Sequence, residues 1–231
     1  VQVHATFNKE LRVGDILHIE SALIERNAKV LFFGHRMVDS TTGEVASTMH
    51  QTAIHFDMDT RRAVDIPGSV ARTLDKSLTK WTGPEPISRD FPEEPIGYFP
   101  TGRDTVQLHE VDVLGHATYH EYIRRFSAAN MHILSAVGFD AEYMRKQRRG
   151  VSTFELDVRY LRELIAGDPV SIESTFGEVG RSSFRLVHKL KNVRSGDITA
   201  MMSQYICQQT VMLPIIGWFL HTAMVPVLCT K

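Results

Sequence analysis

The stretch His109-Glu-Val-Asp-Val-Leu-Gly-His-Ala-Thr-Tyr-His-Glu-Tyr-Ile-Arg-Arg-Phe126 decides both the fold and the candidate site of this chain. Gly115 allows a sharp turn after Asp112, and Thr118 is a suitable N-cap for a helix. The apolar residues that follow have the spacing of one buried helical face: Tyr122, Ile123, Phe126, Ala129, Ile133, Leu134 and Val137. The pattern predicts a helix from about Thr118 to Val137, ended by Gly138.

The start of this predicted helix is suited to acyl chemistry. Its first N–H groups have no partner within the helix and carry the positive end of the helix dipole, so they can stabilise an oxyanion. Asp112 lies one turn upstream and can serve as a base or nucleophile. The alternative is an acid that only complements the dipole.

The spacing of Asp112, Gly115, His116 and Tyr122 resembles the Asp-x-x-Gly-His-x-Asn-x-x-x-Tyr signature of hotdog-fold thioesterases related to 4-hydroxybenzoyl-CoA thioesterase. Thr118 stands where that signature has Asn. The run from Phe154 to Pro169 resembles the strand–turn–strand of the same superfamily, and it is similar to the thioesterase domains associated with carnitine dehydrogenases. The resemblance implies an α+β hotdog fold, an antiparallel sheet wrapped around a long helix, and hydrolysis of an acyl-CoA or acyl-carrier thioester.

Several residues take expected roles under this interpretation. Asp112, His116 and Glu155 are the catalytic candidates, and the backbone around Thr118 and Tyr119 would bind the oxyanion. His116 could instead satisfy a local hydrogen bond, and Glu155 could be the solvent-side neighbour of Asp157 on one strand face. The substrate-binding candidates are Gly115, Tyr122, Arg145, Arg148 and Arg149. The three arginines belong to a basic run that suits the phosphates of coenzyme A or else forms a solvated loop.

The sequence repeats itself at an offset of 153 residues, which aligns Lys9–Ser21 with Arg162–Ser174. Each copy has the pattern strand, Gly-Asp turn, long strand, hairpin, long strand. We therefore expect an incomplete hotdog unit of strands over 1–68 and a complete unit over 106–210, paired as a pseudo-dimer. The first copy's counterpart of Asp112 would lie before residue 1, so we expect a truncated N-terminus.

The segment 69–105 is expected to connect the two copies. Ser69 can cap a short helix with Val70, Leu74, Leu78 and Trp81 on one face. A proline-rich crossover is expected from Gly83 to Gly102.

Composition limits the partners. With 26 basic and 27 acidic residues, the chain has no general field for nucleic acid or anionic membranes. Two cysteines and no secretory signal favour a reducing compartment, the cytoplasm.

The apolar tail 211–231 has no charge from Val211 to Cys229, which leaves a membrane helix open, but Pro214 and Pro226 favour a segment packed on the core or on a partner.

Motifs for other chemistries are absent from the sequence. There is no Cys/His metal spacing, no Gly-rich phosphate loop and no Gly-x-Ser-x-Gly elbow. We expect no metal and no cofactor, because a thioester is already activated. A non-catalytic module that binds an acyl-CoA or acyl-carrier ligand is the alternative, and a dehydratase is disfavoured because its usual signature is missing.

Overall fold

The chain folds into two compact units of antiparallel sheet, described by a computed structural model for residues 1–83, 91 and 97–210. Of these, unit 1 contains 1–83 and 155–160, and unit 2 contains 91, 97–154 and 161–210. Strand β8 (Arg149–Tyr160) therefore contributes its first part to unit 2 and its last part to unit 1. Each unit is a sheet of long strands, as the alternating Val-, Ile- and Thr-rich segments predict.

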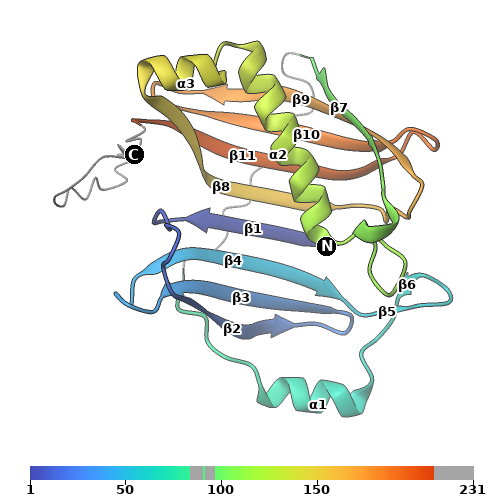
Figure 1. The fold of residues 1–231 in the computed structure, drawn as a ribbon. Helices are drawn as coiled ribbons and strands as arrows, with labels where there is room; N and C mark the ends of the chain where they lie inside the picture. The colour runs from blue at the N-terminus through green and yellow to red at the C-terminus, as the bar shows by residue number, and fades with distance from the viewer. Residues whose placement is uncertain (84–90, 92–96, 211–231) are drawn as a thin grey trace. The chain divides into compact units, whose positions relative to one another are not determined.

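Unit 1 has the sheet order β2-β3-β4-β1-β8 (Figure 1). Its strands are β1 (Gln2–Phe7), β2 (Leu17–Arg26), β3 (Val30–Asp39) and β4 (Val45–Ile54), with the small hairpin β5 (Phe56–Asp57) and β6 (Arg62–Ala63). A single helix, α1 (Gly68–Lys76), follows. Among its described residues, unit 1 has no long helix, as predicted from the sequence.

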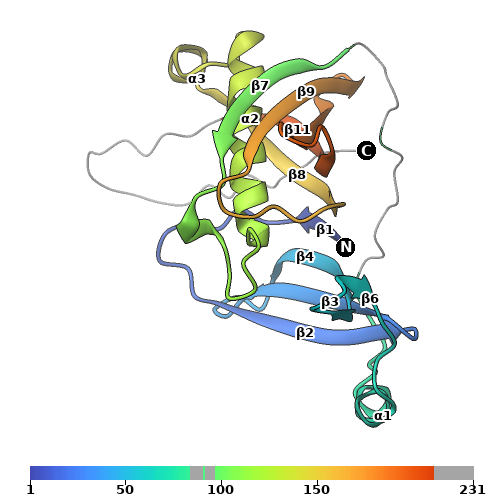
Figure 2. The ribbon, with the colours of Figure 1, turned by 90° about the vertical axis from the view of Figure 1, so that its right-hand side faces the viewer.

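Unit 2 has the sheet order β8-β11-β10-β9-β7. Its strands besides β8 are β7 (Phe99–Thr105), β9 (Pro169–Val179), β10 (Ser183–Asn192) and β11 (Ile198–Thr210). The helices are a 3-10 turn (Leu108–Glu110), α2 (Tyr119–Ala136) and α3 (Ala141–Gln147). The sheet curves around α2 (Figure 2), which is the hotdog arrangement expected from the sequence.

The strands of the two units correspond at the offset of 153 residues. Adding 153 to the bounds of β3 gives the bounds of β10, and the pair Val30↔Ile54 corresponds to Ser183↔Cys207. The register shift between Met37 and Val38 recurs between Leu190 and Lys191. The two units are tandem hotdog units with the same strand pairing.

Helix α2 supplies the core of unit 2. Ile133 and Leu134 pack with Leu186 of β10 and Ile206 of β11, and Phe126 is fully buried. The predicted helix is confirmed, with Thr118 as the N-cap. Val137 was wrongly placed on the buried face: it is 52% exposed, because the helix ends at Ala136 and Gly138 turns the chain away with φ +91°.

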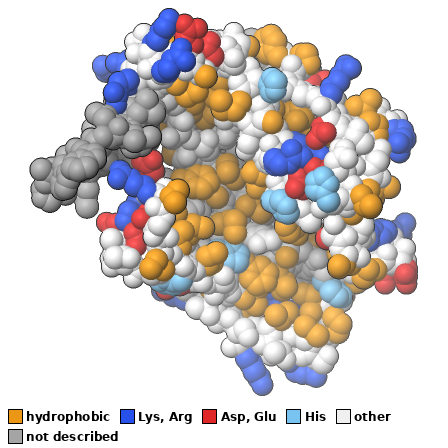
Figure 3. Space-filling view, in the orientation of Figure 1, with side chains coloured by type: hydrophobic (Ala, Val, Ile, Leu, Met, Phe, Trp, Pro, Cys, Tyr) orange, Lys and Arg blue, Asp and Glu red, His pale blue; other side chains and the backbone are white. Residues whose placement is uncertain are grey.

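The matching sheet face of unit 1 is more open. Ile19 is 64% exposed, whereas Ile172, its counterpart 153 residues later, is 3% exposed. Figure 3 shows hydrophobic side chains on the visible face of the region where β2, β3 and β4 lie. This contrast follows from the presence of α2 over the sheet in unit 2.

The connecting segment contains the expected short helix, but the expected cap is wrong. The short helix begins at Gly68 after Pro67, with no side-chain cap from Ser69, and Val70 and Leu78 are exposed. The predicted crossover ends in a strand, because Phe99–Gly102 belong to β7 and pair with β9. The rest of that crossover, 84–90 and 92–96, and the tail 211–231 lie outside the described residues.

Candidate active site

Asp112 lies at the tip of a closed loop between the 3-10 turn and α2. The loop is a narrow hairpin, in which the N–H of Asp112 donates to the carbonyl of His116 at 2.9 Å and Val111 bridges to Ala117. Gly115 has φ +80°, a backbone conformation that favours glycine, and its N–H donates to the Asp112 carbonyl. The sequence-predicted sharp turn is therefore present.

The carboxylate of Asp112 is exposed, and one of its oxygens holds the loop. Oδ1 accepts the N–H of Leu114 at 2.8 Å and that of His116 at 3.3 Å, as in an Asx turn. Oδ2 has no hydrogen-bond partner among the described residues. One oxygen thus fixes the side chain while the other remains available to water or a substrate.

His116 is held on the far side of the loop by the segment before β9. Its Nε2 lies 3.4 Å from Oε2 of Glu163, and its backbone bridges to Ile165. The neighbouring Ala117 N–H donates to the Leu164 carbonyl at 2.8 Å. The structure therefore brings His116 next to Asp112 through the backbone, and pairs its ring with an acid that the sequence reasoning missed.

The start of α2 follows the loop directly. Thr118 has extended backbone at the N-cap, but its side chain makes no capping bond, and its Oγ1 donates to the Glu110 carbonyl at 3.3 Å. Tyr119 is the first helical residue, and its side chain is exposed rather than packed in the core. Among the described residues, Asp112 forms no hydrogen bond to the helix start; the contacts of its carboxylate are within its own turn.

Tyr122 lies on the buried face of α2, at 4% exposure. Its hydroxyl donates to the carbonyl of Arg162 at 3.5 Å. Burial raises the pKa of this phenol to about 12, so Tyr122 keeps its proton and acts as a hydrogen-bond donor rather than as a base.

An ion cluster with a buried centre, Glu110 and Arg125, ties the loop to α2. The carboxylate of Glu110 accepts hydrogen bonds from both Arg124 and Arg125, and Arg125 also lies 3.1 Å from Asp104 of β7. Burial alone raises the pKa of Glu110, but the hydrogen bonds from Arg125 and from the Gln107 N–H, with the charge of Arg125, outweigh it and lower that pKa to about 2. Glu110 is therefore ionised at neutral pH.

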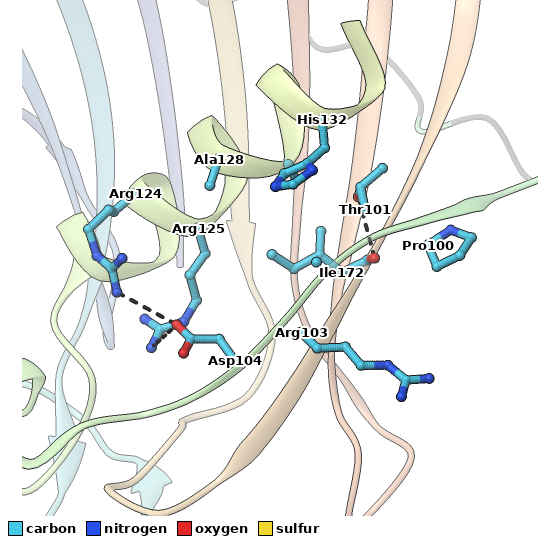
Figure 4. Close-up of a pocket in the computed structure, with 11 residues that line it drawn as sticks. Pro100, Thr101, Arg103, Asp104, Arg124, Arg125, Ala128, His132 and Ile172 are labelled. Carbon is cyan, nitrogen blue, oxygen red and sulfur yellow. Dashed lines mark hydrogen bonds and ion pairs between the residues drawn. The ribbon is translucent and has the colours of Figure 1, made fainter. Parts of the chain in front are cut away.

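A pocket of about 520 Å³ lies between α2 and β7, within the roughly 300–1,000 Å³ range of small-molecule sites. In Figure 4, Arg124 and Arg125 extend from α2 toward Asp104, and Ala128 and His132 follow along the same helix. Small residues lie on both walls, Ala128 on α2 and Gly102 on β7. Neither Asp112 nor His116 lines it.

Glu155 belongs to unit 1, and it is 7% exposed. Its Oε1 lies 3.4 Å from Nε2 of His4 on β1. Asp157 shares its strand face, as predicted, because Glu155 and Asp157 pair with Thr6 and His4; the carboxylate of Asp157 accepts from the Gln2 amide at 2.8 Å. Both acids are buried, so neither is the solvent-side neighbour of the other.

The basic run lies at the end of α3. Arg145 is on that helix, Arg148 has φ +52°, and Arg149 begins β8. All three are exposed and form no ion pair within the part of the chain that the structure describes. In that same part, no group of three or more His, Cys, Asp or Glu side chains is placed to hold a metal ion.

This chain, with an acid-bearing loop before its long helix, matches a family model described as the thioesterase-like superfamily. The match covers residues 1–74 and 106–210, more than half of the chain. The chain belongs to this superfamily. A search of curated proteins gave no match.

Solved structures of thioesterases share the fold. A putative oleoyl thioesterase from Lactobacillus plantarum has a TM-score of 0.67 at 14% identity, over 92% of this chain and 75% of its own. The 12:0-ACP thioesterase from Umbellularia californica has a TM-score of 0.66 at 13% identity, over 90% and 72%. An acyl-ACP thioesterase from Bacteroides thetaiotaomicron has a TM-score of 0.61 at 15% identity, over 89% and 74%. At these identities the likeness shows the fold.

Sequence reasoning missed the residues that hold the loop, above all Glu110, Arg125 and Glu163. Two local signals were present. Gln107 and Glu110 have the spacing of a capping box, which the structure forms, and Glu121 and Arg125 have the i,i+4 spacing of a helical ion pair. No local signal marks Glu163, which meets His116 only in the folded chain.

Proposed function

We propose that this protein is a thioesterase that hydrolyses an acyl-CoA or acyl-carrier thioester at the loop of Asp112. The observation that carries this proposal is the closed loop that joins Asp112 to the start of α2 in a chain of the thioesterase-like superfamily. The similar structures include proteins named as acyl-ACP thioesterases, which supports a thioester substrate.

In the proposed reaction, the free Oδ2 of Asp112 takes a proton from a water molecule as the water oxygen bonds to the thioester carbonyl carbon. The N–H groups at the start of α2, near Thr118 and Tyr119, stabilise the oxyanion. The C–S bond then breaks, and the proton passes to the thiolate, which leaves as the free thiol. Direct attack by Asp112 to form an acyl-enzyme is the other route.

The remaining candidates have supporting roles in this proposal. His116, oriented by Glu163, would position the thioester. The exposed basic side chains of Arg145, Arg148 and Arg149 would bind phosphates of the carrier group. Gly115 shapes the loop, and Tyr122 supports the helix start.

The setting of the reaction also remains a proposal. We place the protein in the cytoplasm, as two tandem units or a higher homo-oligomer, without nucleic acid as a partner. The one cysteine in the described residues, Cys207, is buried and belongs to no disulfide there, as a reducing compartment favours. None of the helices described is long and apolar enough to cross a membrane.

The test is thiol release from a panel of short, branched, aromatic and long acyl-CoAs and an acyl-carrier thioester. Asp112→Asn is expected to lower kcat about 10²- to 10⁴-fold with folding intact. Asp15→Asn is the control, because Asp15 is another exposed acid that accepts a backbone N–H in a turn. Unchanged turnover in Asp112→Asn would exclude the assigned role.

A non-catalytic binding module is the second candidate. It is favoured by Thr118, which stands where the signature has Asn, and by the engagement of Asp112 Oδ1 within its own turn. Calorimetric binding of the panel without thiol release by the wild-type protein would establish the module and end the hydrolase assignment.

A further inference from the structure

Glu110 is the residue through which the active-site loop is tied to the body of unit 2. Its side chain is 1% exposed, and its carboxylate accepts the Gln107 N–H at 2.8 Å in addition to the bonds from Arg124 and Arg125. Its carbonyl accepts the N–H of Thr118 at 3.0 Å. One residue therefore connects the 3-10 turn, the end of the loop and the side of α2.

The loop transmits this anchoring to Asp112 by backbone pairing. Glu110 with Thr118, Val111 with Ala117, and Asp112 with His116 form three successive steps of one narrow hairpin. A shift of the first step moves the last, because few dihedral angles separate them. The position of the Asp112 carboxylate is thus set from Glu110.

The Glu110 carboxylate also fixes helix α2. Arg125 comes from the second turn of α2, is 3% exposed, and its guanidinium donates to the Glu110 carboxylate. The helix start and the loop are therefore held to each other by one buried charge pair. Charge-assisted hydrogen bonds of this kind are strong and directional.

Removal of the Glu110 charge leaves other partners for the arginines. Asp104 lies 3.1 Å from Arg125, and Glu121 accepts from Arg124 at 2.7 Å. The buried guanidinium of Arg125 therefore keeps a counter-charge in Glu110→Gln, and we expect this variant to fold.

We infer that Glu110 is a positioning residue, which acts through Arg125 and the 110–118 hairpin to fix the loop that carries the Asp112 carboxylate relative to α2. The inference rests on the proposed function for its catalytic consequence, but its structural part can be measured without activity. Glu110 does not touch the substrate in this assignment.

The kinetic test compares Glu110→Gln with the wild-type chain on whichever acyl-CoA is the best substrate. A misplacement of about 1 Å can cost on the order of 100-fold in rate, so we expect kcat to fall about 10- to 100-fold. KM should change by less than about threefold, because substrate-binding groups are untouched. Arg125→Gln should lower kcat similarly, and the double variant should add little.

The matched control is Arg185→Gln, which removes another buried charge of unit 2. Arg185 is 4% exposed on β10 and donates to Ser203 at 2.7 Å. This variant should lower the melting temperature and leave kcat unchanged. If the two variants lose the same melting temperature and also show equally low kcat, the Glu110 effect is one of general stability, and the inference is overturned.

Hydrogen exchange separates this inference from the proposed function. The N–H groups of Leu114 and His116, which donate to Asp112, should exchange at least about tenfold faster in Glu110→Gln than in the wild type and in Arg185→Gln. If the wild type releases no thiol, the proposed function fails while this measurement still stands. Unchanged exchange at both N–H groups would overturn the positioning role, whatever the activity.

Discussion

His188 is a histidine whose surroundings forbid a charge. It is fully buried on β10, where Nδ1 lies 2.6 Å from the Ser174 hydroxyl and Nε2 lies 3.1 Å from the Gln204 amide nitrogen. An amide nitrogen can only donate, so Nε2 accepts and the ring proton sits on Nδ1. Burial lowers the pKa of His188 to about 3.

This shift predicts a pH dependence of stability at the residue scale. The unfolded imidazole titrates near its ordinary 6.5 and the folded one at about 3, so its contribution is complete above pH 6.5 and is lost as the pH falls toward 3. We expect His188→Gln to flatten the decrease in urea midpoint between pH 7 and pH 5. His35 is at the matching position in unit 1. Burial also lowers the pKa of its ring, but the site is partly exposed, so His35→Gln should remove less of this decrease than His188→Gln. Equal slopes in wild type and His188→Gln would contradict this prediction.

Asp112, His116 and Glu155 show how much of the site sequence can predict. The turn, its glycine and the adjacent helix start follow from local residue preferences, and all three are present. The side-chain partners do not follow from local preferences, because Glu163 is 47 residues from His116 and His4 is 151 residues from Glu155. These contacts form only when strands and loops pack together.

At the scale of an element, β3 depends on a glycine beneath a tryptophan. A Cβ on Gly34 would lie 2.5 Å from the ring of Trp81, too close for any real contact. Trp81 also meets the His50 ring edge-on at 5.0 Å. The segment after α1 thus reaches β3 because position 34 has no side chain.

Gly34→Ala is therefore expected to displace Trp81. Overpacking of this kind costs roughly 1–3 kcal/mol. A red shift of tryptophan emission and a lower urea midpoint are the measurements. In a Trp81→Ala background the same substitution should cost less than about 0.5 kcal/mol, since the clash with the ring is gone and only the tip of the Ile24 side chain has to move. An equal cost in both backgrounds would assign the effect to the strand backbone instead.

Helix α2 was predictable as an element, since its apolar spacing and its N-cap gave bounds within one residue of those observed. Its charged residues were not. Glu121 and Arg125 lie on the buried side. Glu110 and Asp104 approach the helix there and supply the charges opposite to Arg125, and Arg124 and Arg125 supply the charges opposite to Glu121. Apolar periodicity cannot report such a position.

At the scale of the whole molecule, duplicated positions have different environments. Ile172 faces α2 in unit 2 and is 3% exposed, whereas Ile19 is 64% exposed. We expect Ile172→Ala to lower the free energy of unfolding by about 2–5 kcal/mol. Ile19→Ala should change it by no more than about 0.5 kcal/mol. Chemical denaturation of the full chain measures both, and similar losses would show that the face of unit 1 is covered in solution.

The sequence by itself determined the tandem hotdog units, their strands at the 153-residue offset, and the loop and helix that carry Asp112. These features are local, because strand alternation, helical spacing and turn glycines act over a few residues. The tertiary structure alone decided that Glu110 pairs with Arg125, that Glu163 meets His116, and that Ile172 is buried while Ile19 is exposed. Such outcomes depend on which surfaces meet, and no short stretch of sequence encodes its own neighbours.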